Sequence, residues 1–288
     1  MSKTCIITGA TDGIGKQTAL DLARSGFTLG FVGRDRRKGE SVVSEIIAET
    51  GNENLHFHHA DLFHMKNINT LASEIQSAYN NIDVLVNNAG AYFNTPEMTE
   101  EGFENTFALN HMAYFYLTQL LLEMVKKSSK GRVVNVASAA HRNAELNFDD
   151  IQGIEDYKGW PAYSRSKLMN ILFTYECNRR FKDSGVTFNC LHPGFVNSNF
   201  GNNNSGFTRG SINAAKSLFA INVVKGAKTS VYLAASDEVE DISGKYFDKC
   251  KAVQSSDVSY NTDDQNKLWE MTENMIESIQ FNEGQKHE

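Results

Sequence analysis

The sequence is poor in the features that mark secreted, membrane-spanning and nucleic-acid-binding proteins. Its 288 residues include only three prolines and four cysteines, and the cysteines are scattered with no CxxC pair: Cys5, Cys177, Cys190 and Cys250. This usage is typical of reduced thiols in a cytosol and not of a disulfide framework or a zinc site. No apolar run reaches the ~18 residues of a membrane span. The net charge of -7 argues against a nucleic-acid surface, which needs a basic footprint.

Segment boundaries are also scarce. Residues 1–3 lead straight into the apolar run Thr4-Cys5-Ile6-Ile7, so we expect no signal peptide. Neither a Pro/Gly/Ser-rich linker nor an internal repeat divides the chain, and its length allows a substantial core. We therefore predict one cytoplasmic domain over residues 1–280, followed by a polar tail over residues 281–288.

Short apolar runs alternate with amphipathic stretches along the chain. We expect strands over residues 3–8, 27–33, 56–60, 83–86, 132–136, 186–191 and 244–247. We expect helices over residues 14–25, 37–50, 65–79, 99–127, 161–182, 223–235 and 262–278. The alternation predicts a single α/β domain with a doubly wound parallel (Rossmann) sheet of about seven strands and helices on both faces.

The first expected strand ends in a glycine loop that leads into a helix. Glycines at 9, 13 and 15 remove side chains where the backbone approaches a ligand and where helix packs on strand. The helix amino terminus offers free N–H groups and a positive dipole end to a pyrophosphate. An ordinary tight turn is the alternative interpretation. We predict nucleotide binding by Gly9, Thr11, Asp12, Gly13, Ile14 and Gly15.

The end of the second expected strand bears on the choice of cofactor. A carboxylate there would pair with the ribose hydroxyls of NAD, whereas an arginine suits a 2′-phosphate through bidentate contacts. Gly33 takes the carboxylate's place and Arg34 follows it. The pattern favours NADP(H), although Asp35 keeps NAD(H) open. The charges at 36 and 37 also fit the solvated start of the next helix.

Small and polar residues follow several other strands, where ligands bind in open parallel sheets. Asp61-Leu62 can flank an adenine, and Asn88-Ala89-Gly90 and the turn Pro193-Gly194 lie at the same edge of the sheet. The histidines between residues 56 and 64 lack a cysteine or a carboxylate cluster, so we expect no metal site.

Tyr163 and Lys167 stand one turn apart on an expected helix face. A phenol ionises near pH ~10, and an adjacent ammonium would favour the phenolate. Tyr163 would then exchange a proton with an alcohol or carbonyl at neutral pH. A surface helix with a half-buried tyrosine is the alternative.

Two further polar residues fit around this pair. Ser138 is the first hydroxyl after the strand 132–136, placed to hydrogen-bond a substrate oxygen. Asn110 interrupts an apolar helical pattern and needs a partner. It is either a helix-to-strand tie or a support for a proton relay beside Lys167. Residues 142–160 form an excursion that would line one side of a pocket. The turn-rich stretch 197–210, within the region 197–222, is the candidate substrate lid.

With these motifs in order, the chain resembles the short-chain dehydrogenase/reductase family over nearly its whole length. The motifs are Thr8-Gly9-x-x-x-Gly13-x-Gly15, Asp61-Leu62, Asn87-Asn88-Ala89-Gly90, Asn110, Ser138, Tyr163-x-x-x-Lys167 and Pro193-Gly194. Within the family it is similar to the retinol dehydrogenase group and the WW-domain oxidoreductase. That closer likeness is carried by Arg34-Asp35, the run from Val134 to His141, Ser166-Lys167-Leu168, His192-Pro193-Gly194 and Ser243-Gly244-Lys245-Tyr246-Phe247.

The resemblance implies an NADP(H)-preferring oxidoreductase that acts on a small-molecule carbonyl/alcohol pair. It implies that Lys167 also holds the nicotinamide ribose, that Val196 and Ser198 lie near the nicotinamide amide, and that a homodimer forms through the helices 99–127 and 161–182. Two departures weigh against retinal as substrate and against membrane docking. We expect no counterpart of the group's apolar amino-terminal anchor, and residues 197–210 are mostly Asn, Gly and Ser.

Two other functions remain open at this stage. A non-catalytic dinucleotide-binding sensor or scaffold would keep the glycine loop and lose the reactive side chains. Ser138, Tyr163 and Lys167 are all present, which favours an enzyme. If the protein is an enzyme, a reductase of steroids or other lipid ketones is a further hypothesis, which only the pocket shape can test.

Overall fold

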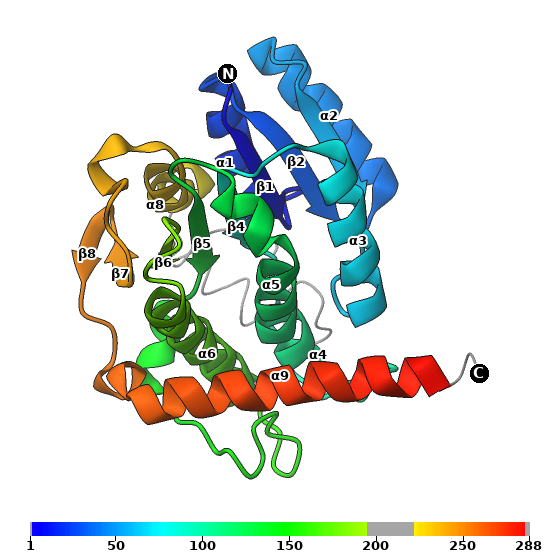
Figure 1. Ribbon diagram of the computed structural model, residues 1–288, viewed down its shortest axis with the longest axis vertical. Coiled ribbons are helices and arrows are strands. Elements are labelled where there is room, and N and C mark those ends of the chain that lie inside the picture. The colour runs from blue at the N-terminus through cyan, green and yellow to red at the C-terminus, as the bar shows by residue number, and fades with distance from the viewer. Residues whose placement is uncertain (1, 195–221, 286–288) are drawn as a thin grey trace.

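The computed structural model describes residues 2–194 and 222–285, which build a central sheet with helices on both of its faces (Figure 1). From edge to edge the strands are β3 (Leu55–His59), β2 (Thr28–Gly33), β1 (Thr4–Thr8), β4 (Val84–Asn87), β5 (Arg132–Val136), β6 (Thr187–His192), β7 (Lys245–Asp248) and β8 (Lys251–Val253). Neighbouring strands from β3 to β7 pair in parallel, and β8 pairs antiparallel with β7. The order of the first strands reverses between β1 and β4, which is the switch point where such sheets bind ligands.

The helices cover the sheet as two layers, each with its own core. α1 (Gly13–Arg24), α2 (Arg36–Thr50) and α8 (Val223–Ala235) pack on one face. α3 (Met65–Ala78), α5 (Ala113–Lys126) and α6 (Gly159–Arg180) pack on the other. The inner strands β1, β2 and β4 are buried on both sides and are therefore almost continuously apolar. The doubly wound parallel architecture expected from the sequence is confirmed.

The sheet has eight strands within the described residues, where about seven were expected. The additional strand, β8, is a three-residue edge strand whose side chains are exposed, so it lacks the apolar run that marks a strand. It follows a turn in which Lys249 and Cys250 both have a positive φ, of 49° and 61°. Such turns match the twist of a hairpin.

The long helix expected over 99–127 begins later and is not uniform. Met98 bridges to Glu104, and the Glu104 carboxylate then caps the helix by accepting a hydrogen bond from the N–H of Phe107 at 3.1 Å. The helical path runs through α4 (Asn105–Phe107), the π-helical turn η1 (Ala108–Met112) and α5. A π-helical turn inside an α-helix is frequently found at functional sites.

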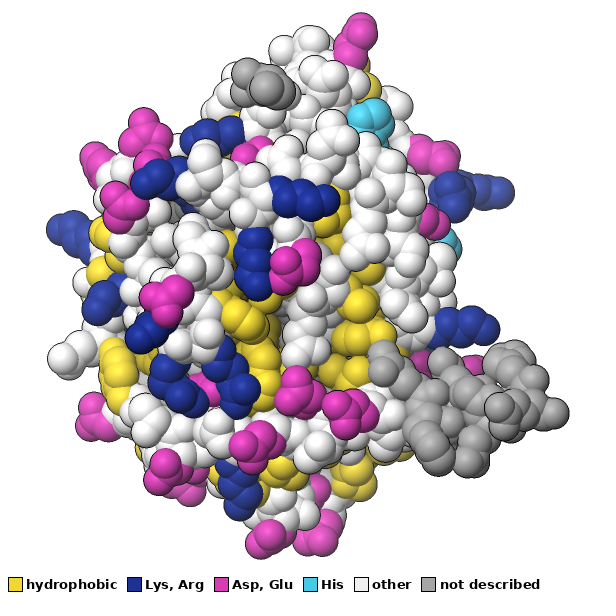
Figure 2. Space-filling view, viewed as in Figure 1, with side chains coloured by type: hydrophobic (Ala, Val, Ile, Leu, Met, Phe, Trp, Pro, Cys, Tyr) yellow, Lys and Arg dark blue, Asp and Glu magenta, His cyan; other side chains and the backbone are white. Residues whose placement is uncertain are grey.

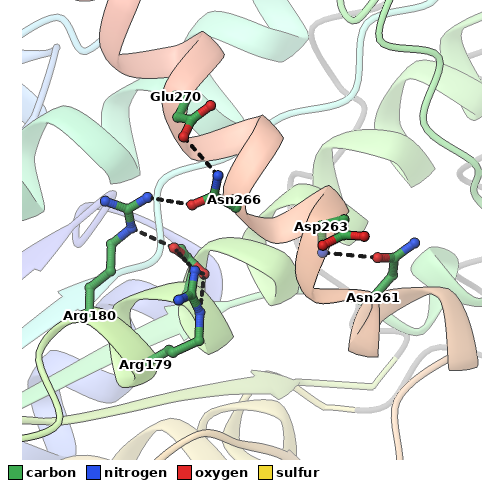
Figure 3. A network of polar contacts seen from close by, with 7 residues as sticks. Arg179, Arg180, Asn261, Asp263, Asn266 and Glu270 are labelled. Carbon is green, nitrogen blue, oxygen red and sulfur yellow. Dashed lines mark hydrogen bonds and ion pairs between the residues drawn. The ribbon is translucent and has the colours of Figure 1, made fainter.

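The carboxyl-terminal helix α9 (Thr262–Gln285) packs across α5 and α6, as Figure 1 shows. It continues beyond the expected end at 278 and through residues 281–285, which were expected to be a tail. The Trp269 ring packs on Phe115 and Phe173, with ring centroids 4.7 and 5.9 Å apart. Polar contacts reinforce the junction (Figure 3): Arg180 pairs with Glu176 on its own helix and donates to Asn266 of α9 at 2.8 Å. This helix therefore covers outer faces of α5 and α6 through which a dimer was expected.

Figure 2 shows acidic and basic side chains interspersed over the face seen in Figure 1. Within residues 2–194 and 222–285, no helix combines the length and the apolar character that crossing a bilayer requires.

Candidate active site

The glycine loop lies against the segment that follows β4. Gly9 has a φ of +66°, and a Cβ atom there would lie 2.9 Å from the Cα of Ala89. A Cβ atom on Gly15 would lie 2.3 Å from the carbonyl oxygen of Gly9. Asp12 caps α1, since its carboxylate accepts a hydrogen bond from the N–H of Gly13 at 2.7 Å. Any side chain at position 15 would collide with backbone, which explains the glycine there.

Asn88 braces this loop from the neighbouring strand end. Its Nδ2 donates to the carbonyl oxygens of Thr8 at 2.8 Å and Gly9 at 3.3 Å. In return the Thr8 hydroxyl oxygen accepts hydrogen bonds from the N–H groups of Asn88 and Ala89. The motif Asn88-Ala89-Gly90 thus fixes the loop shape as well as lining the space beside it.

Three charged side chains near the end of β2, those of Arg34, Asp35 and Lys38, contact different partners. Asp35 caps α2, and its Oδ1 accepts a hydrogen bond from the N–H of Lys38 at 3.0 Å. The Arg34 guanidinium lies over the Phe63 ring, 5.9 Å from its centroid. Lys38 Nζ lies 2.5 Å from Asp12 Oδ2. Sequence reasoning missed Lys38, although its position four residues after Arg34, in the first turn of α2, was an available signal.

The predicted cofactor residues line one cleft of about 550 Å³ at the carboxyl ends of the strands. They are Gly9, Thr11, Asp12, Gly13, Ile14, Gly15, Arg34, Asp61, Leu62, Asn88, Ala89, Gly90, Tyr163, Lys167 and Pro193. Gly33 lines the cleft as well, together with residues that the sequence did not mark, which are Val32, Lys38, Ala60, Phe63, Ala91, Phe93, Leu109, Val136 and Ala137. Gly194 adjoins Pro193 without lining the cleft. Val196, Ser198 and the stretches 197–210 and 197–222 lie outside the described residues, apart from Asn222, which caps α8.

Tyr163 and Lys167 line this cleft, and Ser138 lies beside Tyr163. Tyr163 and Lys167 lie on α6 and are 9% and 4% exposed. Lys167 Nζ donates to the carbonyl oxygen of Val136 at 3.0 Å and lies 5.7 Å from the centroid of the Tyr163 ring. The Ser138 side chain makes a hydrogen bond to the Tyr163 side chain.

Burial dominates the electrostatics of the pair, contrary to the expectation from spacing alone. It raises the pKa of Tyr163 to about 12, and the hydrogen bond from Ser138 offsets only part of this rise. Burial also lowers the pKa of Lys167 to about 7, so this amine is only partly charged at neutral pH. The expected lowering of the Tyr163 pKa by an ammonium is therefore wrong in direction here. Tyr163 is a protonated phenol at neutral pH.

Asn110 is fully buried in the π-helical turn η1 and ties three segments together. Its Oδ1 accepts from the N–H of Ala91 at 2.9 Å, and its Nδ2 donates to the carbonyl oxygen of Ala91 at 2.9 Å. The same Nδ2 donates to the hydroxyl of Ser166 at 3.0 Å, one residue before Lys167. A Cβ atom on Gly90 would lie 3.1 Å from Asn110 Oδ1 and 3.3 Å from Lys167 Nζ. Asn110 thus forms the helix-to-strand tie, directly beside the lysine.

Aromatic rings surround Tyr163 on the side of the excursion 142–160. The Trp160 ring lies 5.8 Å from the Tyr163 ring and is 55% exposed. Tyr92, which follows Asn88-Ala89-Gly90, contacts the same ring edge-on at 6.3 Å. Both contacts are made with the Tyr163 ring.

The histidines of β3 have local partners. His58 hydrogen-bonds the Tyr79 hydroxyl at 2.9 Å, and His59 contacts the carbonyl oxygen of Arg34 at 3.1 Å. Within the described part of the chain, no group of three or more His, Cys, Asp or Glu side chains is arranged to hold a metal ion.

Comparison with known proteins gives the class to which this fold and site belong. The profile of the short chain dehydrogenase family matches residues 3–207, so the chain belongs to this family of oxidoreductases. Within the family it is similar to the retinol dehydrogenases. It is 38% identical over 272 residues to human "Retinol dehydrogenase 13", covering 93% of this chain and 82% of the relative. It is 38% identical over 290 residues to human "Retinol dehydrogenase 14", covering 95% and 86%.

Solved structures agree with this assignment. A putative uncharacterized protein from Mycobacterium paratuberculosis matches with a TM-score of 0.77 and 29% identity, over 95% of this chain and 92% of that one. A short chain dehydrogenase from Shigella flexneri, complexed with NADP, matches with a TM-score of 0.67 and 25% identity, over 86% of this chain and 97% of that one.

Proposed function

We propose that this protein is an NADP(H)-dependent oxidoreductase that interconverts a small-molecule aldehyde or ketone and an alcohol, with Tyr163 as proton donor and acceptor. The observation that carries the proposal is the shared cleft. It is lined by the buried Tyr163 and Lys167, by the glycine loop, and by Arg34 and Lys38. A dinucleotide in this cleft would place its nicotinamide against the first pair, its pyrophosphate against the loop and its adenosine against the two cations.

The residues of the cleft fit NADP(H). The close approach of Gly15 to Gly9 and the amino terminus of α1 form a cradle for the pyrophosphate. Arg34 and Lys38 offer positive charge for a 2′-phosphate, whereas Asp35 is engaged in capping α2, which disfavours NAD(H). The Shigella flexneri relative was solved with NADP. When bound, the nicotinamide supplies or accepts the hydride.

The chain's own residues would handle the proton and the substrate oxygen. Tyr163 gives its proton to the oxygen of the carbonyl as the alcohol forms, or takes it back in the reverse direction. Ser138 hydrogen-bonds the substrate oxygen and the Tyr163 side chain, which fixes the pose. Lys167 holds the nicotinamide ribose. Asn110 bonds to Ala91 and to Ser166, the residue before Lys167, and so holds these two segments together.

The reduction direction suits the protonation state of Tyr163. A phenol whose pKa is raised to about 12 is a proton donor at neutral pH, as carbonyl reduction requires. The Trp160 and Tyr92 rings that pack on Tyr163 favour an apolar carbonyl, including a lipid ketone, as the substrate.

NADPH oxidation measured against a panel of aldehydes and ketones tests the proposal. We expect turnover of apolar members of the panel. Bound NADPH with no turnover of any member would instead support a dinucleotide-binding sensor or scaffold. We further propose a cytoplasmic location, to be tested by fractionation. Any homodimer would have to accommodate α9 over α5 and α6, and sedimentation analysis with and without NADPH tests whether one forms.

A further inference from the structure

Two histidines outside the Tyr163–Lys167 pair contact the segment that carries Ser138. His141 lies in the short helix η2 (Ala139–Asn143) and is fully buried. His192 is the last residue of β6, the strand next to β5 in the sheet. Neither histidine has a role in the proton transfer described above.

The contacts of His141 define its tautomer. Its Nε2 lies 3.1 Å from the backbone nitrogen of Ser256, which can only donate, so Nε2 carries no proton. Its Nδ1 lies 2.6 Å from the carbonyl oxygen of Ser138, which can only accept, so Nδ1 carries the proton. A single neutral tautomer satisfies both contacts, and this tautomer fixes the backbone of Ser138.

The contacts of His192 define the opposite tautomer. Its Nδ1 accepts hydrogen bonds from the N–H of Ala139 at 3.2 Å and from the N–H of Gly194 at 3.3 Å. Both partners can only donate, so the proton of the neutral ring is on Nε2. One nitrogen atom thereby links the residue after Ser138 to the turn that follows Pro193 at the edge of the cleft.

We propose that His192 is a positioning residue that couples the Ser138 segment to the Pro193-Gly194 turn, that His141 fixes the same segment from its other side, and that protonation of His192 breaks this coupling. This inference rests on the proposed function, because it assigns the two rings to the placement of the Ser138 hydroxyl beside Tyr163. A charged His141 would turn an Nε2–H toward the Ser256 N–H. A charged His192 would turn an Nδ1–H toward two N–H groups. Both changes replace hydrogen bonds by donor–donor contacts.

The charged surroundings favour the neutral rings. Burial is the main cause that lowers the pKa of both histidines below its ordinary value of 6.5. Arg142 faces both rings and lowers the pKa of each further. Lys249 has the same effect on His192, and His192 has the same effect on His141. Asp248 opposes this effect at His192, and the hydrogen bond to the Ser138 carbonyl opposes it at His141. The Tyr246 ring packs edge-on against His141 at 5.0 Å. Both rings are therefore neutral at pH 7 and gain a proton only in more acidic solution.

This predicts an acid limb in the pH profile that Tyr163 and Lys167 do not produce. Acidification keeps the Tyr163 proton donor protonated and completes the charging of Lys167, so neither group loses its function as the pH falls. A fall of kcat for carbonyl reduction at acidic pH that changes in the His192 variants is therefore the signature of this ring. The measurement uses initial rates with NADPH, corrected for the acid decay of NADPH without substrate. The range extends roughly 2 pH units below and roughly 1.5 units above the ordinary histidine pKa.

Three variants sharpen the test. His192→Asn keeps an oxygen that can accept the same two hydrogen bonds and cannot titrate, so kcat at pH 7 stays within a few-fold of wild type and the acid limb moves to lower pH. His192→Ala removes the acceptor, so kcat falls by about 10-fold to 100-fold, more than KM rises. His58→Asn is the matched control, because His58 is a buried histidine with a lowered pKa on the opposite side of the sheet. It leaves the limb unchanged.

The outcomes separate this inference from the proposed function. Wild-type enzyme that reduces no carbonyl overturns the proposed function and this role with it. Wild-type enzyme with turnover but no acid limb, or a His192→Ala variant with wild-type kcat, overturns the inference alone. Long-range ¹⁵N–¹H NMR of the histidine rings, assigned with the variants, gives a readout independent of turnover. We expect Nδ1–H for His141 and Nε2–H for His192 at pH 7, and the reverse tautomers or charged rings would contradict the inference.

Discussion

The Nζ atom of Lys38 lies 2.5 Å from Oδ2 of Asp12, and this ion pair joins the glycine loop to the first turn of α2 at the edge of the cleft. The pair holds a positive charge next to Arg34, where a 2′-phosphate would lie. Both side chains are substantially exposed, so the pair itself contributes little to stability. The ion pair bears instead on whether the cleft binds NADP(H) or NAD(H).

We predict that Lys38→Ala weakens NADPH binding by about 10-fold and leaves NADH binding nearly unchanged, because one charge-assisted contact to phosphate is worth ~1.5–3 kcal/mol before solvent screening. Arg34→Ala acts in the same direction. Nucleotide fluorescence titrations at fixed salt give both dissociation constants. Arg36→Ala is the control, since Arg36 is on the same helix turn but points to Glu40 at 3.8 Å. An unchanged ratio of NADPH to NADH affinity in Lys38→Ala would rule out this role.

Asn110 provides a second prediction, on stability. Asn110→Ala leaves the N–H and the carbonyl of Ala91 without their present partner, at a cost of ~1–3 kcal/mol for each buried group that stays unpaired. Chemical denaturation measures the loss in the free energy of unfolding. Asn69→Ala, on the exposed face of α3, is the control and changes it by less than ~0.5 kcal/mol. Equal stabilities of the two variants would show that the tie contributes nothing.

Lys167 makes stability depend on pH in a defined direction. Its pKa falls from 10.5 to about 7 on folding, so the unfolded chain binds this proton more tightly between those values. The cost of the buried charge is fully present below about pH 7 and disappears as the pH approaches the unfolded value. Lys167→Met lacks this cost, so its Tm exceeds that of wild type by most at pH 6 and by least at pH 10.

Differences in Tm between the variant and wild type, measured at several pH values, isolate this contribution from other titrating groups. Lys66→Met, at an exposed position on α3, is expected to show a difference that does not vary with pH. A Tm difference for Lys167→Met that grows toward alkaline pH would contradict the account.

Trp269 tests whether α9 is part of the core. Trp269→Ala removes ring contacts with Phe115 and Phe173 and the cation–π contact of Arg180, whose Cζ is 4.5 Å from the ring centroid. The expected loss is ~3–5 kcal/mol. Trp269→Phe loses less, since the indole Nε1 is buried with no hydrogen-bond partner among the described residues. Trp160→Ala, at an exposed ring, leaves the free energy of unfolding nearly unchanged, and a similar loss in both alanine variants would contradict the assigned packing.

The sequence predicted the sheet and most of the cleft for one physical reason. Buried parallel strands must be apolar runs, and their carboxyl ends must carry the small and polar residues that approach a ligand. Gly9, Asn88 and Pro193 could therefore be placed at one edge of the sheet from the sequence. β8 was not predicted, because three exposed residues in a hairpin have no such pattern.

The spacing of residues along the chain could not predict features that depend on tertiary contacts. The π-helical turn at Asn110 is set by partners in Ala91 and Ser166, which are distant in the chain. The pKa of Tyr163 depends on how deeply the ring is buried, and the one-turn spacing to Lys167 predicted the opposite direction. The opposite tautomers of His141 and His192 follow from backbone groups on three different segments.

The most direct measurement is the turnover of Tyr163→Phe with NADPH and a carbonyl that the wild-type protein reduces. This change removes the hydroxyl and keeps the ring that packs on Trp160 and Tyr92. We predict a fall in kcat of about 10²- to 10⁴-fold, the usual worth of a positioned proton donor, with the dissociation constant of NADPH unchanged. Turnover near that of wild type, with NADPH still bound, would contradict the assignment of Tyr163 as the proton donor.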